Sequence, residues 1–294
     1  MGSFVLNPRA GLSMKICRTV QEVRSASRGA RMAGRKVGFV PTMGALHEGH
    51  LSLVRAAKKR SEVVFVSIFV NPTQFGPHED FSKYPRTFDH DCELLQTEGV
   101  DVLFAPAVDE MYPKGAITFV TVEGLSDKLD GVSRPGHFRG VTTVVSKLFN
   151  IIEPDLAFFG QKDAAQVAII SRMVRDLKSP VEIVVCPIVR EPDGLAMSSR
   201  NAYLNAGERK QALVLRKSLS RAEELFRTGE RRTSELVQAA QKLFAQDPSV
   251  RLDYFQIVDP DTLEPVDTIS GRALLAVAAY VGNTRLIDNV TLSA

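Results

Sequence analysis

The chain has 294 residues, of which 44% are hydrophobic and 24% are charged, and its formal net charge of +3 is the small difference between 37 basic and 34 acidic residues. This composition is typical of a soluble globular protein with room for two domains, and the near balance of charge argues against sequence-independent binding of nucleic acid. Three scattered cysteines and the lack of an apolar run of about 18–20 residues argue against a disulfide framework and a membrane span, so we expect a cytoplasmic protein.

The first two thirds of the chain alternate strand-like and helix-like segments. Residues 1–13 are interpreted as a loose extension, because Met14 could itself begin the protein. Short apolar runs rich in β-branched residues predict strands, and segments with helical spacing predict helices. Such an alternation is typical of a parallel sheet with right-handed crossovers. The predicted strands are residues 36–40, 62–70, 100–104, 156–159 and 181–186, and the predicted helices are residues 51–60, 88–97, 138–152 and 164–177.

After Pro187 the pattern changes. Residues 206–227 and 233–245 predict two helices, and residues 253–258, 273–280 and 285–290 predict strands gathered at the end of the chain. Helices followed by grouped strands indicate a smaller α+β domain. We therefore expect a Rossmann-like α/β domain over residues 14–189 and a smaller α+β C-terminal lid domain over residues 190–294. In an open parallel sheet, ligands bind beyond the carboxyl ends of the strands, so the loops there are the candidates for chemistry.

The first of these loops is PTMGALHEGH, residues 41–50, between a predicted strand and a helix that starts near His50. Backbone N–H groups at a helix N-terminus favour an anion, with Gly44 and Gly49 permitting close approach, and a histidine there can donate to phosphate. The HEGH spacing lacks the i, i+4 pair of the helical zinc motif, so a metal site is the weaker interpretation. From these residues alone, a glycine turn with two solvated histidines remains open.

Three further loops carry polar groups at or just beyond predicted strand ends. The loop that begins NPTQF offers Asn71, Gln74 and Tyr84, and an amide such as Gln74 suits a hydroxylated substrate. FFGQKDAAQ, residues 158–166, offers a lysine and a glycine to phosphates, and REPDGLAMSSRN, residues 190–201, is a donor-rich loop that could close over a triphosphate. Taken singly, each loop is also explained by a polar turn or a helix cap. Taken together, they could converge at one end of a single sheet.

The four motifs together resemble the pantoate–β-alanine ligase (pantothenate synthetase) family, in order and spacing, from about Val20 to the C-terminus. PTMGALHEGH is similar to the HIGH signature of the nucleotidyltransferase superfamily, and MSSRN is similar to the counterpart of its KMSKS loop. One departure is Gln161, where the family often has glutamate. The resemblance implies a Rossmann-like fold, a homodimer, and an ATP-dependent condensation of pantoate with β-alanine to pantothenate, through pantoyl adenylate, with release of pyrophosphate and AMP.

The resemblance also implies roles for individual residues. His47, His50 and Lys162 are expected to be catalytic through contacts with the ATP phosphates, with His50 foremost. Mg²⁺ is expected to be carried largely by ATP oxygens, so no protein metal site is assigned. The residues expected to bind the nucleotide are Pro41, Thr42, Met43, Gly44, His47, Gly49, His50, Gly160, Gln161, Lys162, Asp163, Val189, Met197, Ser198, Ser199 and Arg200. The residues expected to bind the other substrates are Gln74, Gln166, Asn71, Tyr84 and Arg134, the last from the basic segment SRPGHFRG at residues 133–140.

Two other functions are compatible with these loops. A nucleotidyltransferase of the same superfamily acting on another acceptor would make a stable nucleotide product and would release no AMP when β-alanine is added. A non-catalytic nucleotide- or RNA-binding module would bind RNA with strong salt dependence and without turnover. The near-neutral charge and the lack of aromatic-rich basic segments argue against such a module.

Overall fold

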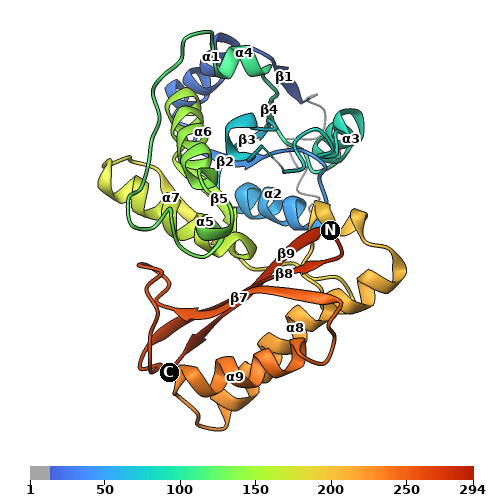
Figure 1. Cartoon of the computed structure of the whole chain (residues 1–294). Coiled ribbons are helices and arrows are strands. Elements are labelled where there is room, and N and C mark those ends of the chain that lie inside the picture. The colour runs from blue at the N-terminus through green and yellow to red at the C-terminus, as the bar shows by residue number, and fades with distance from the viewer. Residues whose placement is uncertain (1–13, 78) are drawn as a thin grey trace, which may run out of the picture.

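The computed structural model describes residues 14–77 and 79–294, so the expected extension at residues 1–13 lies outside the described part of the chain. Within that part, the strands form a six-stranded sheet with the order β1-β4-β3-β2-β5-β6 and a three-stranded sheet with the order β7-β8-β9 (Figure 1). No helix among these residues is long and apolar enough to cross a membrane.

Every pairing in the first sheet is parallel, which confirms the predicted parallel sheet. The sequence did not predict the short strand β1 or the first helix, α1 (Val20–Met32), which starts with a capping box at Thr19. The strands are β1 (Lys15–Cys17), β2 (Val37–Thr42), β3 (Val63–Ile68), β4 (Val102–Phe104), β5 (Leu156–Gly160) and β6 (Glu182–Cys186).

Pro41 and Thr42 lie in strand β2 and not in the turn after it. Because β5 pairs with β2 only at Gly38 and Phe39, the missing N–H of Pro41 removes no ladder bond on that side.

Helices cover both faces of the first sheet (Figure 1). The helices α2 (Glu48–Arg60) and α3 (Phe88–Thr97) pack on one face, and α1, α6 (His137–Ile152) and α7 (Ala164–Asp176) pack on the other. Successive strand residues point to opposite faces, so Phe158 packs toward α2 whereas Phe159 packs toward α6. Two short helices, α4 (Val108–Met111) and α5 (Asp130–Ser133), and the single turns η1 (Pro72–Gln74), η2 (Gln161–Asp163) and η3 (Ser199–Tyr203) lie in the connections.

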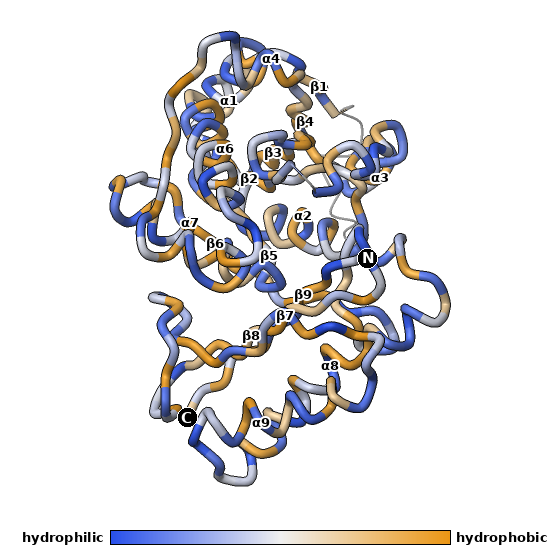
Figure 2. Tube along the Cα trace, in the orientation of Figure 1, coloured by the Kyte–Doolittle hydropathy of each residue, from blue (hydrophilic) through white to orange (hydrophobic). Residues whose placement is uncertain are grey.

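The second sheet carries two helices on one face. The helices α8 (Ala206–Arg227) and α9 (Thr233–Phe244) share one core with the strands β7 (Val250–Val258), β8 (Arg272–Val281) and β9 (Thr284–Ser293), whose pairings are antiparallel. Along α8 and α9 hydrophilic and hydrophobic residues alternate, as is typical of helices with one buried face (Figure 2). The α+β character of this region is confirmed, and its strands are longer than predicted. The exact division between residues 189 and 190 stays a prediction.

The strand order of the first sheet fixes where its loops meet. From β2 the chain runs outward through β3 and β4, and it then returns to the other side of β2 to form β5 and β6. At such a reversal, the loops that follow the two neighbouring strands leave the sheet in opposite directions and open a crevice where open α/β sheets bind ligands. Here the reversal lies between β2 and β5, so residues 41–50 and residues 160–163 flank the crevice.

Candidate active site

The loop after β2 holds its two histidines through its own backbone. His47 is the N-cap of α2, and its Nδ1 accepts a hydrogen bond from the N–H of Gly49 at 3.1 Å. Nδ1 of His50 accepts from the N–H of His47 at 3.3 Å, and the two ring centroids lie 4.1 Å apart. Because Nδ1 is the acceptor in both rings, each neutral imidazole carries its proton on Nε2. Two N–H donors are thereby left for a ligand.

Both rings are neutral at physiological pH. Burial, reinforced by the positive charge of Lys162, lowers the pKa of His47 to about 4. Burial, reinforced by the neighbouring His47, lowers the pKa of His50 to about 3. The histidines therefore act as uncharged hydrogen-bond donors, and the positive charge beside them comes from other residues.

Two glycines and one buried carboxylate give this loop its shape. Gly44 has a φ of +81°, and a Cβ there would meet the Asp91 carboxylate and the Ile68 side chain at 3.0 Å. A Cβ at Gly49 would lie 2.8 Å from the His47 ring. Asp91, fully buried on α3, accepts hydrogen bonds from the N–H groups of Ala45 and Leu46, both at 2.9 Å. Sequence reasoning missed Asp91, because its role depends on a contact between segments far apart in the chain.

The segment after β5 supplies a cation to the crevice. Lys162 lies in η2, and its Nζ is 3.4 Å from Oδ1 of Asp163. Burial acts to raise the pKa of Asp163, but the charge and hydrogen bond of Lys162 outweigh it, and the pKa is lowered overall. Asp163 is therefore ionised, and the pair stands beside the two neutral histidines.

The loop after β6 lies against the first loop. Ser199 Oγ donates a hydrogen bond to the carbonyl of Ala45 at 3.1 Å, and the N–H of Met197 donates to the carbonyl of Val189 at 3.0 Å. Ser198 caps η3 by accepting from the N–H of Arg200 at 3.3 Å. The structure thus brings the first and the last of the predicted motifs into direct contact.

These loops and Tyr84 enclose a cavity of about 160 Å³, here called the smaller cavity. Leu53, one turn after His50 on α2, was not predicted, although its i+3 spacing is a signal that places it on the same face. Pro187 and Ile188, directly after β6, were also missed. Pro41, Thr42, Gly44 and Gln161 lie outside the lining set. The predicted residues that line the smaller cavity are Met43, His47, Gly49, His50, Tyr84, Gly160, Lys162, Asp163, Val189, Met197, Ser198, Ser199 and Arg200.

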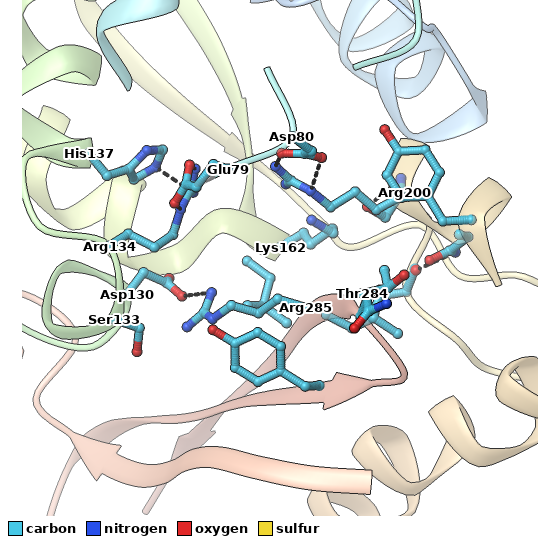
Figure 3. A pocket seen from close by; sticks show the side chains of 18 of the residues that line it. Glu79, Asp80, Asp130, Ser133, Arg134, His137, Lys162, Arg200, Thr284 and Arg285 are labelled. Carbon is cyan, nitrogen blue, oxygen red and sulfur yellow. Dashed lines mark hydrogen bonds and ion pairs between the residues drawn. The ribbon is translucent and has the colours of Figure 1, made fainter. Parts of the chain in front are cut away.

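A larger cavity of about 740 Å³ adjoins the smaller one and shares Lys162, Ser198 and Arg200 with it. Its lining includes two predicted substrate residues, Gln166 and Arg134, and it extends to the second sheet at strand β9. Figure 3 shows three ion pairs among its side chains, each between different segments of the chain: Glu79 with Arg134, Asp80 with Arg200, and Asp130 with Arg285.

Glu79 and Asp80, which are consecutive in the sequence, each form an ion pair with an arginine of the larger cavity (Figure 3). Glu79 accepts from Nε and NH2 of Arg134, both at 2.7 Å. Asp80 accepts from Nε and NH2 of Arg200 at 3.1 and 3.0 Å. A guanidinium binds a carboxylate or a phosphate with the same two-pronged geometry. Glu79 and Asp80 therefore take the positions that oxygens of an anionic ligand would take on these arginines.

Gln74 has a buried amide that is held from one side. Its Oε1 accepts from Nδ2 of Asn71 at 3.1 Å, and its Nε2 donates to the sulfur of Met43 at 2.9 Å. Asn71 is buried and also donates to the carbonyl of Gly140 and accepts from the Tyr112 hydroxyl at 2.9 Å, so it orients Gln74. A thioether is a weak acceptor. A ligand oxygen would therefore be a stronger hydrogen-bond acceptor for the Gln74 amide N–H groups than the Met43 sulfur is.

His137 fixes the backbone behind Gln74. Its Nδ1 donates to the Gln74 carbonyl at 2.8 Å, and its Nε2 accepts from Arg134 at 3.0 Å. Burial, reinforced by the charge of Arg134, lowers the pKa of His137 to about 4. This neutral histidine connects the predicted substrate residues Gln74 and Arg134.

The matches found by comparison with known sequences agree with one another. The family model described as Pantoate-beta-alanine ligase matches residues 15–291. Pantothenate synthetase from Koribacter versatilis is 58% identical over 281 residues, which is 96% of this chain and 97% of that relative. Pantothenate synthetase from Acidobacterium capsulatum is 60% identical over 290 residues, with 95% of this chain and 97% of the relative covered.

Comparison with solved structures agrees with the sequence match. The crystal structure of pantothenate synthetase from Thermus thermophilus superposes with a TM-score of 0.90 at 47% identity, over 94% of this chain and 99% of that one. Pantoate-beta-alanine ligase from Francisella tularensis, complexed with beta-gamma ATP and beta-alanine, superposes with a TM-score of 0.74 at 36% identity, over 94% and 97% of the two chains.

Proposed function

This chain belongs to the pantoate–β-alanine ligase family, and on that premise we propose which of its residues carry each step of the reaction. The protein is a ligase that forms pantothenate from pantoate and β-alanine, and ATP is a substrate. What remains for the residues to explain is how a carboxylate is made reactive, how the nucleotide is held, and where pantoate lies.

The reaction proceeds through an acyl adenylate. The pantoate carboxylate attacks the α-phosphorus of ATP, the bond from that phosphorus to the bridging oxygen breaks, and pyrophosphate leaves. The β-alanine amine then attacks the acyl carbon and loses a proton, and AMP leaves with the electrons of the carbon–oxygen bond. A carboxylate oxygen does not leave by itself, whereas AMP does. Catalysis therefore needs in-line positioning and stabilisation of phosphate charge more than covalent chemistry by the protein.

The smaller cavity is the nucleotide site in this proposal. Nε2–H of His47 and of His50 donate to phosphate oxygens, and His50 stabilises the charge that develops on the α-phosphate. Lys162 supplies the positive charge, and Ser198, Ser199 and Arg200 close over the triphosphate from the loop after β6. The single observation that carries this proposal is that Nδ1 of each histidine accepts a hydrogen bond from a backbone N–H, because this leaves each ring with an Nε2–H donor for the ligand.

Pantoate lies beside Met43 in this proposal. Gln74 replaces its bond to the Met43 sulfur with bonds to the hydroxyls and carboxylate of pantoate, and Gln166 contacts the same molecule from the larger cavity. Arg134 and Tyr84 complete the substrate residues. Asn71 acts on pantoate through Gln74, which it orients.

We assign Mg²⁺ to the nucleotide. Among residues 14–77 and 79–294, no group of three or more His, Cys, Asp or Glu side chains could hold a metal ion, and the acidic residue that lines the smaller cavity is Asp163. These residues fit an ion whose ligands would be mainly phosphate oxygens and water, and Asp163 is the carboxylate among them that could add a ligand. When bound, Mg²⁺ would neutralise charge on the triphosphate.

The remaining assignments concern organisation. We propose a cytoplasmic homodimer in which residues 14–189 bind ATP and pantoate and residues 190–294 act as the lid. The exposed apolar side chains of Ile117 and Phe119, between α4 and α5, are compatible with a surface that a second copy covers. Sedimentation equilibrium of the whole chain tests the dimer.

The adenylate mechanism is tested by isotope exchange. The protein is incubated with ATP, Mg²⁺, labelled pyrophosphate and pantoate, without β-alanine. Label should enter ATP only when pantoate is present, because the first step is reversible and needs no amine. Folded protein that forms pantothenate but shows no exchange would exclude a free adenylate step.

A further inference from the structure

Strand β9 of the second sheet contacts the segment that carries Lys162. Asn289 lies in β9 and is 2% exposed. Its Nδ2 donates to the backbone carbonyls of Gln161 and Lys162, both at 2.9 Å, and its Oδ1 accepts from Nε2 of Gln161 at 3.1 Å. Both N–H groups and the oxygen of this amide are therefore bound to the same short segment, η2.

Asn289 lies on the face of β9 that meets the first half of the molecule. Successive strand residues alternate between faces, so Arg285 and Asn289 share one face, whereas Leu286 and Leu292 point into the core with α8 and α9. Arg285 forms an ion pair with Asp130 of α5 at 2.7 Å (Figure 3). This face of β9 thus contacts the first half at α5 and again at η2.

The neighbouring Asp288 anchors β9 to the base of the closing loop. Its buried carboxylate accepts from NH1 and NH2 of Arg190 at 2.7 and 2.9 Å, and it also accepts from the N–H of Asn289 at 2.7 Å. Arg190 in turn forms a β-bridge with Ala196, directly before Met197. A continuous set of hydrogen bonds therefore connects the loop after β6, strand β9 and η2.

We propose that Asn289 is a positioning residue for Lys162: the second sheet fixes the backbone of η2, and this decides where the lysine ammonium stands in the nucleotide site. The inference rests on the proposed role of Lys162 at the ATP phosphates. A lysine side chain is long and flexible. The Lys162 ammonium contacts Asp163 at 3.4 Å, which is too long for a strong hydrogen bond to hold it in place. The reach of its ammonium is therefore set by where the backbone of η2 is held.

The test uses Asn289→Asp, which keeps the size of the side chain but replaces the donor Nδ2 by an oxygen that faces two carbonyl oxygens. Pantoate-dependent exchange should fall about 10–100-fold at saturating substrate, since a displacement on the order of 1 Å costs up to about 10²-fold. The KM for pantoate should be unchanged. Thr291→Ala, an exposed position on the same face of β9, is the matched control and should match the wild type. Wild-type exchange in Asn289→Asp would overturn the inference.

A double-mutant cycle separates positioning from general loss of structure. If Asn289 acts through Lys162, exchange by Asn289→Asp in a Lys162→Ala background should equal that of Lys162→Ala alone. Losses that multiply would overturn the inference, because Asn289 would then act independently of Lys162. Should Asn289→Asp fail to fold, Gln161→Leu removes the bond between the two amides at a side chain that lies outside the lining of both cavities, and it is put through the same cycle. If the wild-type protein shows no exchange, the proposed adenylate step is wrong. If the wild type exchanges but the losses of the two single variants multiply in the double variant, only the role of Asn289 is wrong.

Discussion

The two adjoining cavities are organised in different ways. In the smaller cavity, the donors of His47 and His50 are fixed by hydrogen bonds within a single loop and helix start. In the larger cavity, the arginines are held by carboxylates from another segment, Glu79 on Arg134 and Asp80 on Arg200. The two histidine donors need no rearrangement to meet a ligand. An anion that binds Arg134, or Arg200, which lines both cavities, must first displace the carboxylate paired with it. On the proposed function, His47 and His50 form a preorganised centre, and Arg134 and Arg200 form an exchangeable rim from which an anionic substrate displaces a carboxylate.

The preorganised centre should be the most sensitive to truncation. His50→Ala removes one fixed donor to the phosphate, so pantothenate formation should slow by about 10²–10³-fold, the usual cost of losing one such donor. The fold should be retained, because Asp91 still holds the turn, although the N–H of His47 loses its acceptor on His50. His90→Ala, at an exposed position on α3, is the control. A rate within twofold of the wild type would remove His50 from the catalytic residues.

Gln74 stands between the two arrangements, because its amide oxygen is held by Asn71 whereas its amide nitrogen donates to the weak sulfur acceptor of Met43. Gln74→Ala should raise the KM for pantoate by about tenfold, the equivalent of about 1.4 kcal/mol, because the variant lacks the amide that hydrogen-bonds the hydroxyls of pantoate. The KM for ATP should stay constant. Steady-state kinetics with each substrate varied in turn distinguish the two, with Gln96→Ala on the surface of α3 as the control. A change in the KM for ATP alone would refute the assignment of Gln74 to pantoate.

The exchangeable rim predicts a gain of affinity. Asp80→Asn keeps the size of the side chain but removes the charge that holds Arg200, which then becomes available to ATP. Because a partly exposed ion pair is worth up to about 1 kcal/mol, the KM for ATP should fall by up to about fivefold. Asp109→Asn, at an exposed position on α4, is the control. A higher KM for ATP would mean that Asp80 supports Arg200 for the ligand and does not compete with it.

The sequence predicted the parts of this site that depend on local chemistry. The alternation of buried strands and helices predicted the parallel sheet, which is confirmed. Glycines beside histidines after a strand predicted an anion site, which stays a prediction. The residues that it missed act across long separations. Asp91 shapes the first loop from α3, and Asn289 binds η2 from the last strand. Neither has a motif of its own, because a buried Asp or Asn is defined by the partners that the fold brings to it.

The boundaries of elements were missed for a related reason. The helix after the first loop begins at Glu48, earlier than predicted, because His47 serves as its N-cap through a ring nitrogen. Serine, threonine, aspartate and asparagine are the usual caps, so a histidine cap gives no recognisable signal. The pairing of Glu79 and Asp80 with two arginines was equally invisible, since a polar loop contains no information about its distant partners.

The smallest expected effect is that of pH on the preorganised centre. The pKa values of His47 and His50 are lowered to about 4 and about 3, whereas an unfolded histidine titrates near 6.5. Protonation of these rings therefore costs no stability above about pH 6.5, whereas the free energy of unfolding falls as the pH drops from about 6.5 toward 4, because only the unfolded chain takes up protons in that range. Between pH 6 and pH 8 the donors should stay unchanged.

Pantoate-dependent exchange suits this measurement, because it does not involve the titrating amine of β-alanine. The ratio of the wild-type rate to that of His50→Gln cancels the pH dependence of all other groups, and it should vary by less than about twofold from pH 8 to pH 6. A ratio that changed tenfold across this range would show that His50 titrates during turnover. The charge of the centre would then depend on the pH of the solvent, and the contrast between fixed donors in the smaller cavity and displaceable ion pairs in the larger one would fail at His50.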